Sequence, residues 1–152
     1  ETNEVKQCYC LFLHAITHNA LVPILLTNQL ARHLDTILSA LLEDIVSNPM
    51  MNVRKLCINI LKALVIEWCA SSGAKEPLEG WHQFVFQRIG CEVSLRLCLN
   101  GSLNLSKDVA SNIVFGELLS LQRTLYDCLG EKFVECGVNV ELTQLGFPPP
   151  VL

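Results

Sequence analysis

Apolar side chains recur every three or four residues along most of the chain, which is the period of an α-helix with one buried face. In the first segment the positions at this spacing are Val5, Cys8, Tyr9, Phe12 and Ile16. A second segment starts near Gln29 and places on one stripe Leu30, Leu34, Ile37, Leu38, Leu41 and Ile45. Polar residues fill the remaining positions, so the sequence predicts two amphipathic helices.

A third helix is predicted after Asn48-Pro49, because Asn can cap free backbone N–H groups and Pro suits the first helical turn. From Val53 to Trp68 this segment is apolar on almost every side. A helix of that kind lies between neighbours rather than at the surface. We therefore expect core positions at Leu61, Leu64 and Trp68.

A fourth helix is expected from about Gly80, with an apolar surface made of Trp81, Phe84, Val85, Phe86, Ile89, Val93 and Leu97. On another side Arg88, Glu92 and Arg96 recur every four residues, a spacing at which opposite charges attract weakly. We expect this polar row to face water.

A fifth, long helix is predicted with Ser106 as its cap, and its apolar stripe consists of Val114, Leu118, Leu121, Leu125 and Cys128. Gly130 separates it from a short sixth helix that ends at Gly137. Pro148-Pro149-Pro150 cannot continue a helix, because proline lacks the backbone donor and clashes with the preceding turn. Residues 138–152 are therefore predicted to be an extended, Pro-rich end or linker.

No segment alternates strictly between apolar and polar residues, so the fold class is predicted to be all-α, with about six helices. Short turns between successive helices indicate antiparallel pairs, either in a compact bundle or in a stacked array of helical hairpins. A first helix without a clear cap and a hydrophobic content of 51% favour the array. Residues 1–137 are interpreted as a fragment of a longer α-solenoid.

The composition excludes several classes of protein. No apolar stretch reaches the ~20 residues that a membrane span requires, and no signal peptide is visible, so we expect an intracellular protein. A net charge of −4 argues against a dedicated nucleic-acid module. The cysteines within apolar helical patterns are expected to be free thiols that behave as small hydrophobes: Cys8, Cys10, Cys57, Cys69, Cys91, Cys98 and Cys128.

Several segments resemble known patterns. Asn48-Pro49 followed by Asn52-Val53-Arg54 is similar to the degenerate signature of a HEAT repeat. A broader resemblance, over roughly residues 7–140, is to the tRNA exportin (exportin-T) family of importin-β-like nuclear transport receptors. It rests on three segments. Gln7–Leu13 is similar to the family's Gln-x-Tyr-x-x-Phe segment, and Lys55–Trp68 is similar to a family helix that ends in Leu-Trp. Trp81–Ile89 is similar to the family's Phe-x-x-Phe-Val-Tyr segment.

The resemblance implies a HEAT-type solenoid that carries tRNA from nucleus to cytoplasm together with Ran-GTP and passes nuclear pore proteins. In this family Ran is held mainly by an N-terminal region that this chain lacks, and the present segment would belong to the C-terminal arch that wraps cargo. The resemblance also implies shuttling between nucleus and cytoplasm. Neither a membrane nor a small-molecule substrate is implied.

The candidate RNA-binding residues follow from this implied cargo. They are Lys55, Lys62, Arg88, Arg96 and Arg54. An Arg in a HEAT signature more often braces a neighbouring repeat, and Glu92 partly cancels the field of the two arginines beside it. Since no aromatic residues interleave with these cations, we expect contacts to phosphate and to shape rather than to bases.

No residue pattern supports catalysis, a cofactor or a metal. His14 and His18 lie four residues apart on a helix, but a zinc site needs three or four ligands and no HExxH pattern is present. Cys8-x-Cys10 is not a CxxC motif. No enzyme is therefore predicted, and the alternative to a tRNA export receptor is a helical-repeat scaffold that binds proteins in apolar grooves.

Overall fold

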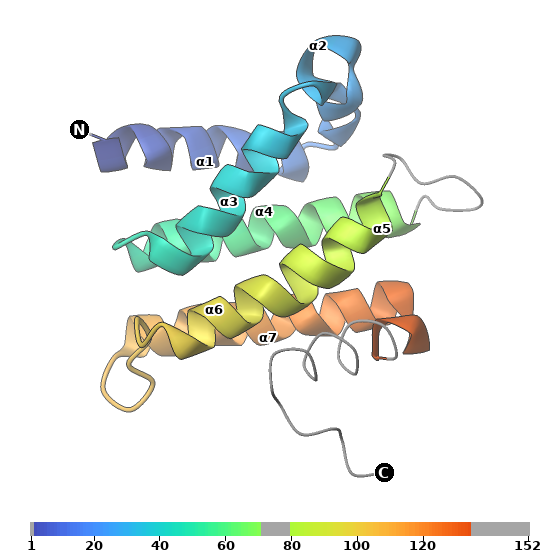
Figure 1. Cartoon of the computed structure of the whole chain (residues 1–152). Coiled ribbons are helices and arrows are strands. Elements are labelled where there is room, and N and C mark those ends of the chain that lie inside the picture. Colours follow the sequence, from blue (N-terminus) through green and yellow to red (C-terminus); the bar gives the residue numbers. More distant parts are fainter. Residues whose placement is uncertain (1, 71–79, 135–152) are drawn as a thin grey trace.

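The computed structural model describes residues 2–70 and 80–134 of the chain, and all regular structure in these two ranges is helical (Figure 1). The elements are α1 (Thr2–His18), η1 (Val22–Leu26), α2 (Asn28–Ala31), α3 (Leu34–Ser47), α4 (Met51–Ala70), α5 (Trp81–Phe84), η2 (Val85–Val93), α6 (Ser94–Leu99) and α7 (Val109–Leu129). The predicted all-α class is confirmed. Residues 138–152, predicted to be extended, and the predicted end of a sixth helix at Gly137 lie outside the described ranges; residues 131–134 are helical.

The helices form two layers. In one layer α1, α4 and α7 run in the same direction, and in the other α3 and the continuous α5–η2–α6 run the opposite way (Figure 1). Helix α4 packs against α1, α3 and α7, while α3 also contacts η2 and α6. This arrangement of antiparallel helices in stacked hairpins agrees with the predicted HEAT-type architecture.

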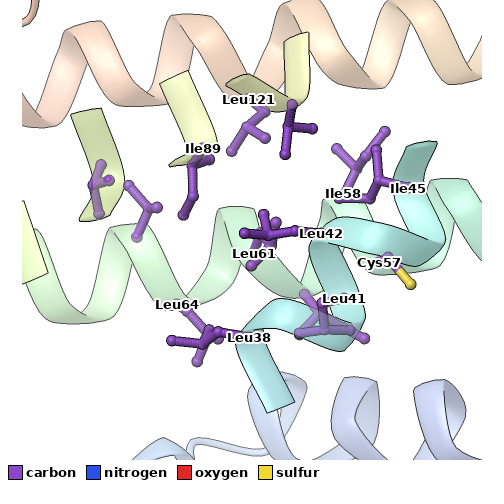
Figure 2. Close-up of a cluster of buried hydrophobic side chains, with 14 of the residues drawn as sticks. Leu38, Leu41, Leu42, Ile45, Cys57, Ile58, Leu61, Leu64, Ile89 and Leu121 are labelled. Carbon is purple, nitrogen blue, oxygen red and sulfur yellow. The ribbon is translucent and has the colours of Figure 1, made fainter. Parts of the chain in front are cut away.

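The core lies around α4, as its nearly uniform apolar sequence predicts. Leu61, Leu64 and Trp68 are buried, with exposed fractions of 0%, 1% and 2%. Figure 2 shows side chains of α3, α4, η2 and α7 meeting in this cluster, among them Leu38, Leu41, Leu42, Ile45, Ile58, Ile89 and Leu121. At the end of α4 the rings of Trp68 and Trp81 meet edge to face at 4.7 Å between centroids. This contact fixes the start of α5 against α4.

Helix α1 forms as predicted, but most of the residues that were expected on its buried face are exposed. Val5, Tyr9 and Phe12 are 67%, 40% and 62% exposed, and Cys8 is exposed too, whereas the buried face consists of Cys10, Leu13 and Ile16. Both sets have helical spacing. Periodicity identifies residues that share a face, but when a helix carries two apolar faces the partner decides which one is buried, and here α4 meets the Cys10 face.

The predicted second helix is interrupted. A turn at Arg32 and His33 separates α2 from α3, and the backbone N–H of His33 bonds to Leu30 at 2.9 Å. Neither Gly nor Pro marks this break, so the sequence pattern gives no local signal for it. The stripe within α3 holds, since Leu34, Leu38, Leu41 and Ile45 are all buried.

Two helix starts are displaced from their predicted positions. Helix α4 begins at Met51, so Pro49 precedes the helix, although the side-chain oxygen of Asn48 does accept from the Met50 amide at 2.9 Å. Helix α7 is capped by Asp108 and not by Ser106. The Asp108 carboxylate accepts from the amides of Ala110 and Ser111 at 3.1 and 3.0 Å. It can do so because a cap must directly precede the first helical residue.

The middle of the fourth predicted helix is a π-helix. The buried positions recur at exact intervals of four: Trp81, Val85, Ile89, Val93 and Leu97. On an α-helix residues four apart drift by about 40° around the axis, because 3.6 residues complete a turn. The wider turn of η2 opposes this drift and keeps the series on one face. The polar row on another side of this helix faces water as predicted, with side chains of Arg88, Glu92 and Arg96 between 36% and 45% exposed.

Candidate functional site

Arg54 is buried, with an exposed fraction of 4%. Its Nε donates to the carbonyl oxygen of Asn48 at 2.5 Å, and its Nη1 donates to Ser102 Oγ at 2.7 Å. Burial lowers the pKa of the guanidinium. Because Asn48 precedes α4 and Ser102 follows α6, these bonds connect two hairpins, which is the bracing role that the HEAT signature favours.

Lys55 and Lys62 lie on the side of α4 that faces α7 and share one acidic partner. Glu117 of α7 has its Oε1 3.9 Å from Lys55 Nζ and its Oε2 3.4 Å from Lys62 Nζ. Lys62 Nζ also donates to Ser120 Oγ at 3.1 Å. The side chains of Lys55 and Lys62 are 45% and 25% exposed. Two cations against one carboxylate leave this group with one net positive charge.

Arg88 and Arg96 lie in the other layer, where two carboxylates balance them. Arg88 Nε is 3.1 Å from Glu92 Oε2, and Arg96 reaches Glu92 Oε1 at 3.5 Å. Arg96 Nη2 also donates to Glu43 Oε2 of α3 at 3.0 Å. The hydrogen bond from Arg96 lowers the pKa of Glu43. This group has no net charge.

The structure does not bring the five candidate cations together. Lys55 and Lys62 link α4 to α7, whereas in the second layer Arg96 links α6 to α3 and Arg88 pairs with Glu92 within η2 (Figure 1). Arg54 is buried and belongs to neither surface group. Sequence reasoning did not identify the acidic partners Glu43 and Glu117, because each is more than fifty residues from the cation it contacts.

A shallow groove of about 200 Å³ opens between the start of α3 and α5. Its lining is mostly apolar and includes one carboxylate, and it consists of Ala31, Leu34, Asp35, Leu38, Gly80, Trp81 and Phe84. A groove of this kind suits a small apolar element of a protein partner better than a nucleic acid.

One cluster could hold a metal ion, and sequence reasoning missed it. Cys10, Asp44 and Cys57 are buried and place ligand atoms within 4.8 Å of one another. They come from α1, α3 and α4, so no sequence motif joins them. His14 and His18, which the sequence singled out, instead stack their rings at 4.1 Å between centroids. Burial, together with the neighbouring His18, lowers the pKa of His14.

The comparisons with known proteins agree on one family. The exportin-T family model matches residues 1–152. Exportin-T of Oryza sativa subsp. japonica is 32% identical over 144 residues, which make up 95% of this chain and 14% of the rice protein. Exportin-T of Arabidopsis thaliana is 28% identical over 134 residues, which make up 88% of this chain and 14% of that protein. No solved structure matches the chain.

Proposed function

Because the chain belongs to the exportin-T family, we propose that it is a segment of a nuclear export receptor that carries tRNA to the cytoplasm together with Ran-GTP. The observation that carries this proposal is the match of the family model to residues 1–152. Exportin-T is a family of HEAT-repeat transport receptors and not of enzymes, in agreement with the absence of a catalytic pattern. Within the described residues no helix is long and apolar enough to cross a membrane.

In this proposal the segment contributes part of the C-terminal arch around the cargo. The whole receptor shuttles between nucleus and cytoplasm and contacts nuclear pore proteins, and Ran-GTP is held mainly by an N-terminal region. The chain covers 14% of the length of each of the two curated relatives, so these partners are proposed for the whole receptor. A solenoid distributes binding over many repeats, each adding little.

The exposed face of α1 supports a place within a longer solenoid. Val5, Leu11 and Phe12 expose 67%, 51% and 62% of their surfaces. Stacked helical hairpins bury such faces against their neighbours, because a single repeat cannot cover its own apolar surface. We infer that an adjoining helical repeat of the same protein covers this face.

Among the candidate cations, Lys55 and Lys62 are the best placed to contact phosphate. Their group has one net positive charge, and the Lys55 ion pair is long at 3.9 Å, so a phosphate oxygen can replace Glu117 at little electrostatic cost. Arg88 and Arg96 would have to leave two carboxylates that neutralise them. We propose that Arg54 acts indirectly, by fixing the start of α4 from which Lys55 extends.

The test measures tRNA affinity of the full-length receptor with Ran-GTP as a function of salt. Replacing Lys55 and Lys62 by Gln should weaken binding of different tRNAs similarly and reduce the salt slope by about one per lost phosphate contact. Glu117→Gln should strengthen binding, because it releases both lysines. Arg123→Gln is the matched control, since Arg123 is an exposed cation paired with Asp127 on α7. Unchanged affinity and slope in the lysine variants and in Glu117→Gln would contradict the proposed contact.

The groove beside Trp81 supports the second candidate function, a scaffold that binds proteins. Phe84 lies at this groove and is half-buried. A Phe84→Arg variant with normal helical content should then lose protein partners while it keeps tRNA affinity. If Phe84→Arg keeps all protein partners and the lysine variants lose tRNA binding, the results favour the export receptor over the scaffold.

A further inference from the structure

Three ligand-bearing side chains meet where α1 packs against α3 and α4. Cys10 Sγ lies 3.5 Å from Cys57 Sγ, and a carboxylate oxygen of Asp44 completes a set within 4.8 Å. Their exposed fractions are 1%, 0% and 6%. In Figure 2 the sulfur of Cys57 lies on the side of α4 that faces α1. The three residues are thus fixed by three different helices in the interior.

We propose that Cys10, Cys57 and Asp44 bind a soft divalent cation of the zinc class. Thiolates select such ions over Mg²⁺ and Ca²⁺, and a carboxylate is an accepted third ligand. Sulfur ligands ~2.3 Å from a tetrahedral ion lie roughly 3.8 Å apart, close to the separation already present between the two thiols. A disulfide would require the sulfurs to approach to about 2.05 Å, which differs more from the observed separation of 3.5 Å than the spacing in a metal site does.

The charges around the cluster fit a bound cation. Lys6 Nζ is 2.7 Å from Asp44 Oδ1, so its positive charge adds to that of the ion. Two thiolates and one carboxylate carry three negative charges, which a divalent cation and Lys6 neutralise completely. Neutrality matters here because an unbalanced charge in the interior is strongly destabilising.

A second polar group orients the carboxylate. Asn48 Nδ2 donates to Asp44 Oδ1 at 3.1 Å, and Lys6 donates to the same oxygen. Both donors therefore fix the orientation of the Asp44 carboxylate. Outer partners of this type fix ligand geometry in metal sites.

The site would connect α1 to the rest of the segment. A fourth position is left for water, since the cluster supplies three ligand atoms. Lys6 lies at the solvent edge of the cluster with its side chain 46% exposed. This inference does not depend on tRNA binding, because it concerns the attachment of α1 and not the cargo surface.

The test uses the reduced, chelator-treated full-length protein and Co²⁺ as a spectroscopic probe. Wild-type protein should show a thiolate-to-cobalt charge-transfer band that Zn²⁺ removes by competition. Cys10→Ser and Cys57→Ser should each abolish the part of this band that belongs to the site. Cys8→Ser is the matched control on the same helix, because Cys8 is exposed, and it should keep the full band. Asn48→Ala should weaken cobalt affinity roughly 10- to 100-fold.

A second measurement requires no variant and so cannot fail through misfolding. Zn²⁺ should slow alkylation of Cys10 and Cys57 at least tenfold in the wild-type protein while Cys8 reacts equally fast with and without the ion. The proposal is overturned if wild-type protein shows no thiolate–cobalt band, or if the band is the same in Cys10→Ser and Cys57→Ser. It is equally overturned if Zn²⁺ leaves the alkylation rates of both buried thiols unchanged.

Discussion

Replacement of Arg54 by Met separates a structural brace from an RNA contact. Methionine keeps an unbranched apolar stem of similar length, so packing around the stem changes little, while both donated hydrogen bonds are lost. The bonds in question go to the buried carbonyl of Asn48 and to Ser102 Oγ.

The size of the expected destabilisation depends on whether the Asn48 carbonyl and the Ser102 hydroxyl can find another hydrogen-bond partner once the guanidinium is removed. A buried carbonyl left without its donor destabilises by about 1–3 kcal/mol. Ser102 is only half-buried and can bond to water, so its loss adds little. Removal of the guanidinium also relieves the desolvation that lowers the pKa of Arg54, which offsets part of the loss. We expect the free energy of unfolding to fall by roughly 1–3 kcal/mol.

Urea unfolding followed by tryptophan fluorescence measures this change, because both tryptophans of the chain are 2% exposed and report on the core. Arg88→Met is the control: it removes an exposed cation and should change stability by less than about 1 kcal/mol. If Arg54→Met changes the free energy no more than Arg88→Met does, the two hydrogen bonds do not brace the hairpins. Loss of tRNA salt slope without loss of stability would make Arg54 a direct phosphate contact.

Three further predictions concern packing and capping. Trp68→Ala should reduce the free energy of unfolding by about 3–5 kcal/mol through cavity formation, and a loss below ~1 kcal/mol would show that Trp68 is peripheral. Gly90→Ala should lower the melting temperature, because its Cβ would lie 2.7 Å from Phe133 Cε2; an unchanged value would mean that the ring yields. Asp108→Ala should accelerate amide hydrogen exchange at Ala110 and Ser111. The hydrogen bond from Ser111 lowers the pKa of Asp108, so the cap should be present above the ordinary carboxyl range and be lost as pH falls through the folded pKa. Protection of these amides, measured relative to their intrinsic exchange rates, should fall over the same pH range, and protection that does not change with pH would contradict this.

The sequence predicts the centre of the fold better than its edge. Helix α4 is apolar nearly all round, so no choice of face was needed and the burial of Leu61, Leu64 and Trp68 is confirmed. In α1 two apolar faces compete, and only the packed neighbour selects Cys10 over Phe12. The turn at Arg32 and His33 likewise depends on tertiary packing, since neither residue is a helix breaker.

The candidate site was only partly accessible from sequence. The cations could be identified from the implied cargo, but their charge balance depends on Glu43 and Glu117, which reach them from distant helices. The cluster of Cys10, Asp44 and Cys57 could not be predicted from the sequence for the same reason, because its members lie far apart in the chain. Cys10 and Cys57 are 47 residues apart, and only the alignment of α1 with α4 brings their sulfurs together. Spacing rules detect interacting residues that lie on the same helix or loop. The lysines and Glu117 lie on different helices, and so do Cys10 and Cys57.

The π-helix η2 makes its segment respond differently to the loss and to the gain of a residue. A π-helix closes each turn with a hydrogen bond over five residues instead of four, so deleting one residue between Val85 and Val93 allows the segment to return to α-helical turns. Trp81 can then stay against Trp68 while Leu97 stays in the core. An inserted residue has no such adjustment and would rotate the two ends of the segment relative to each other by about 100°.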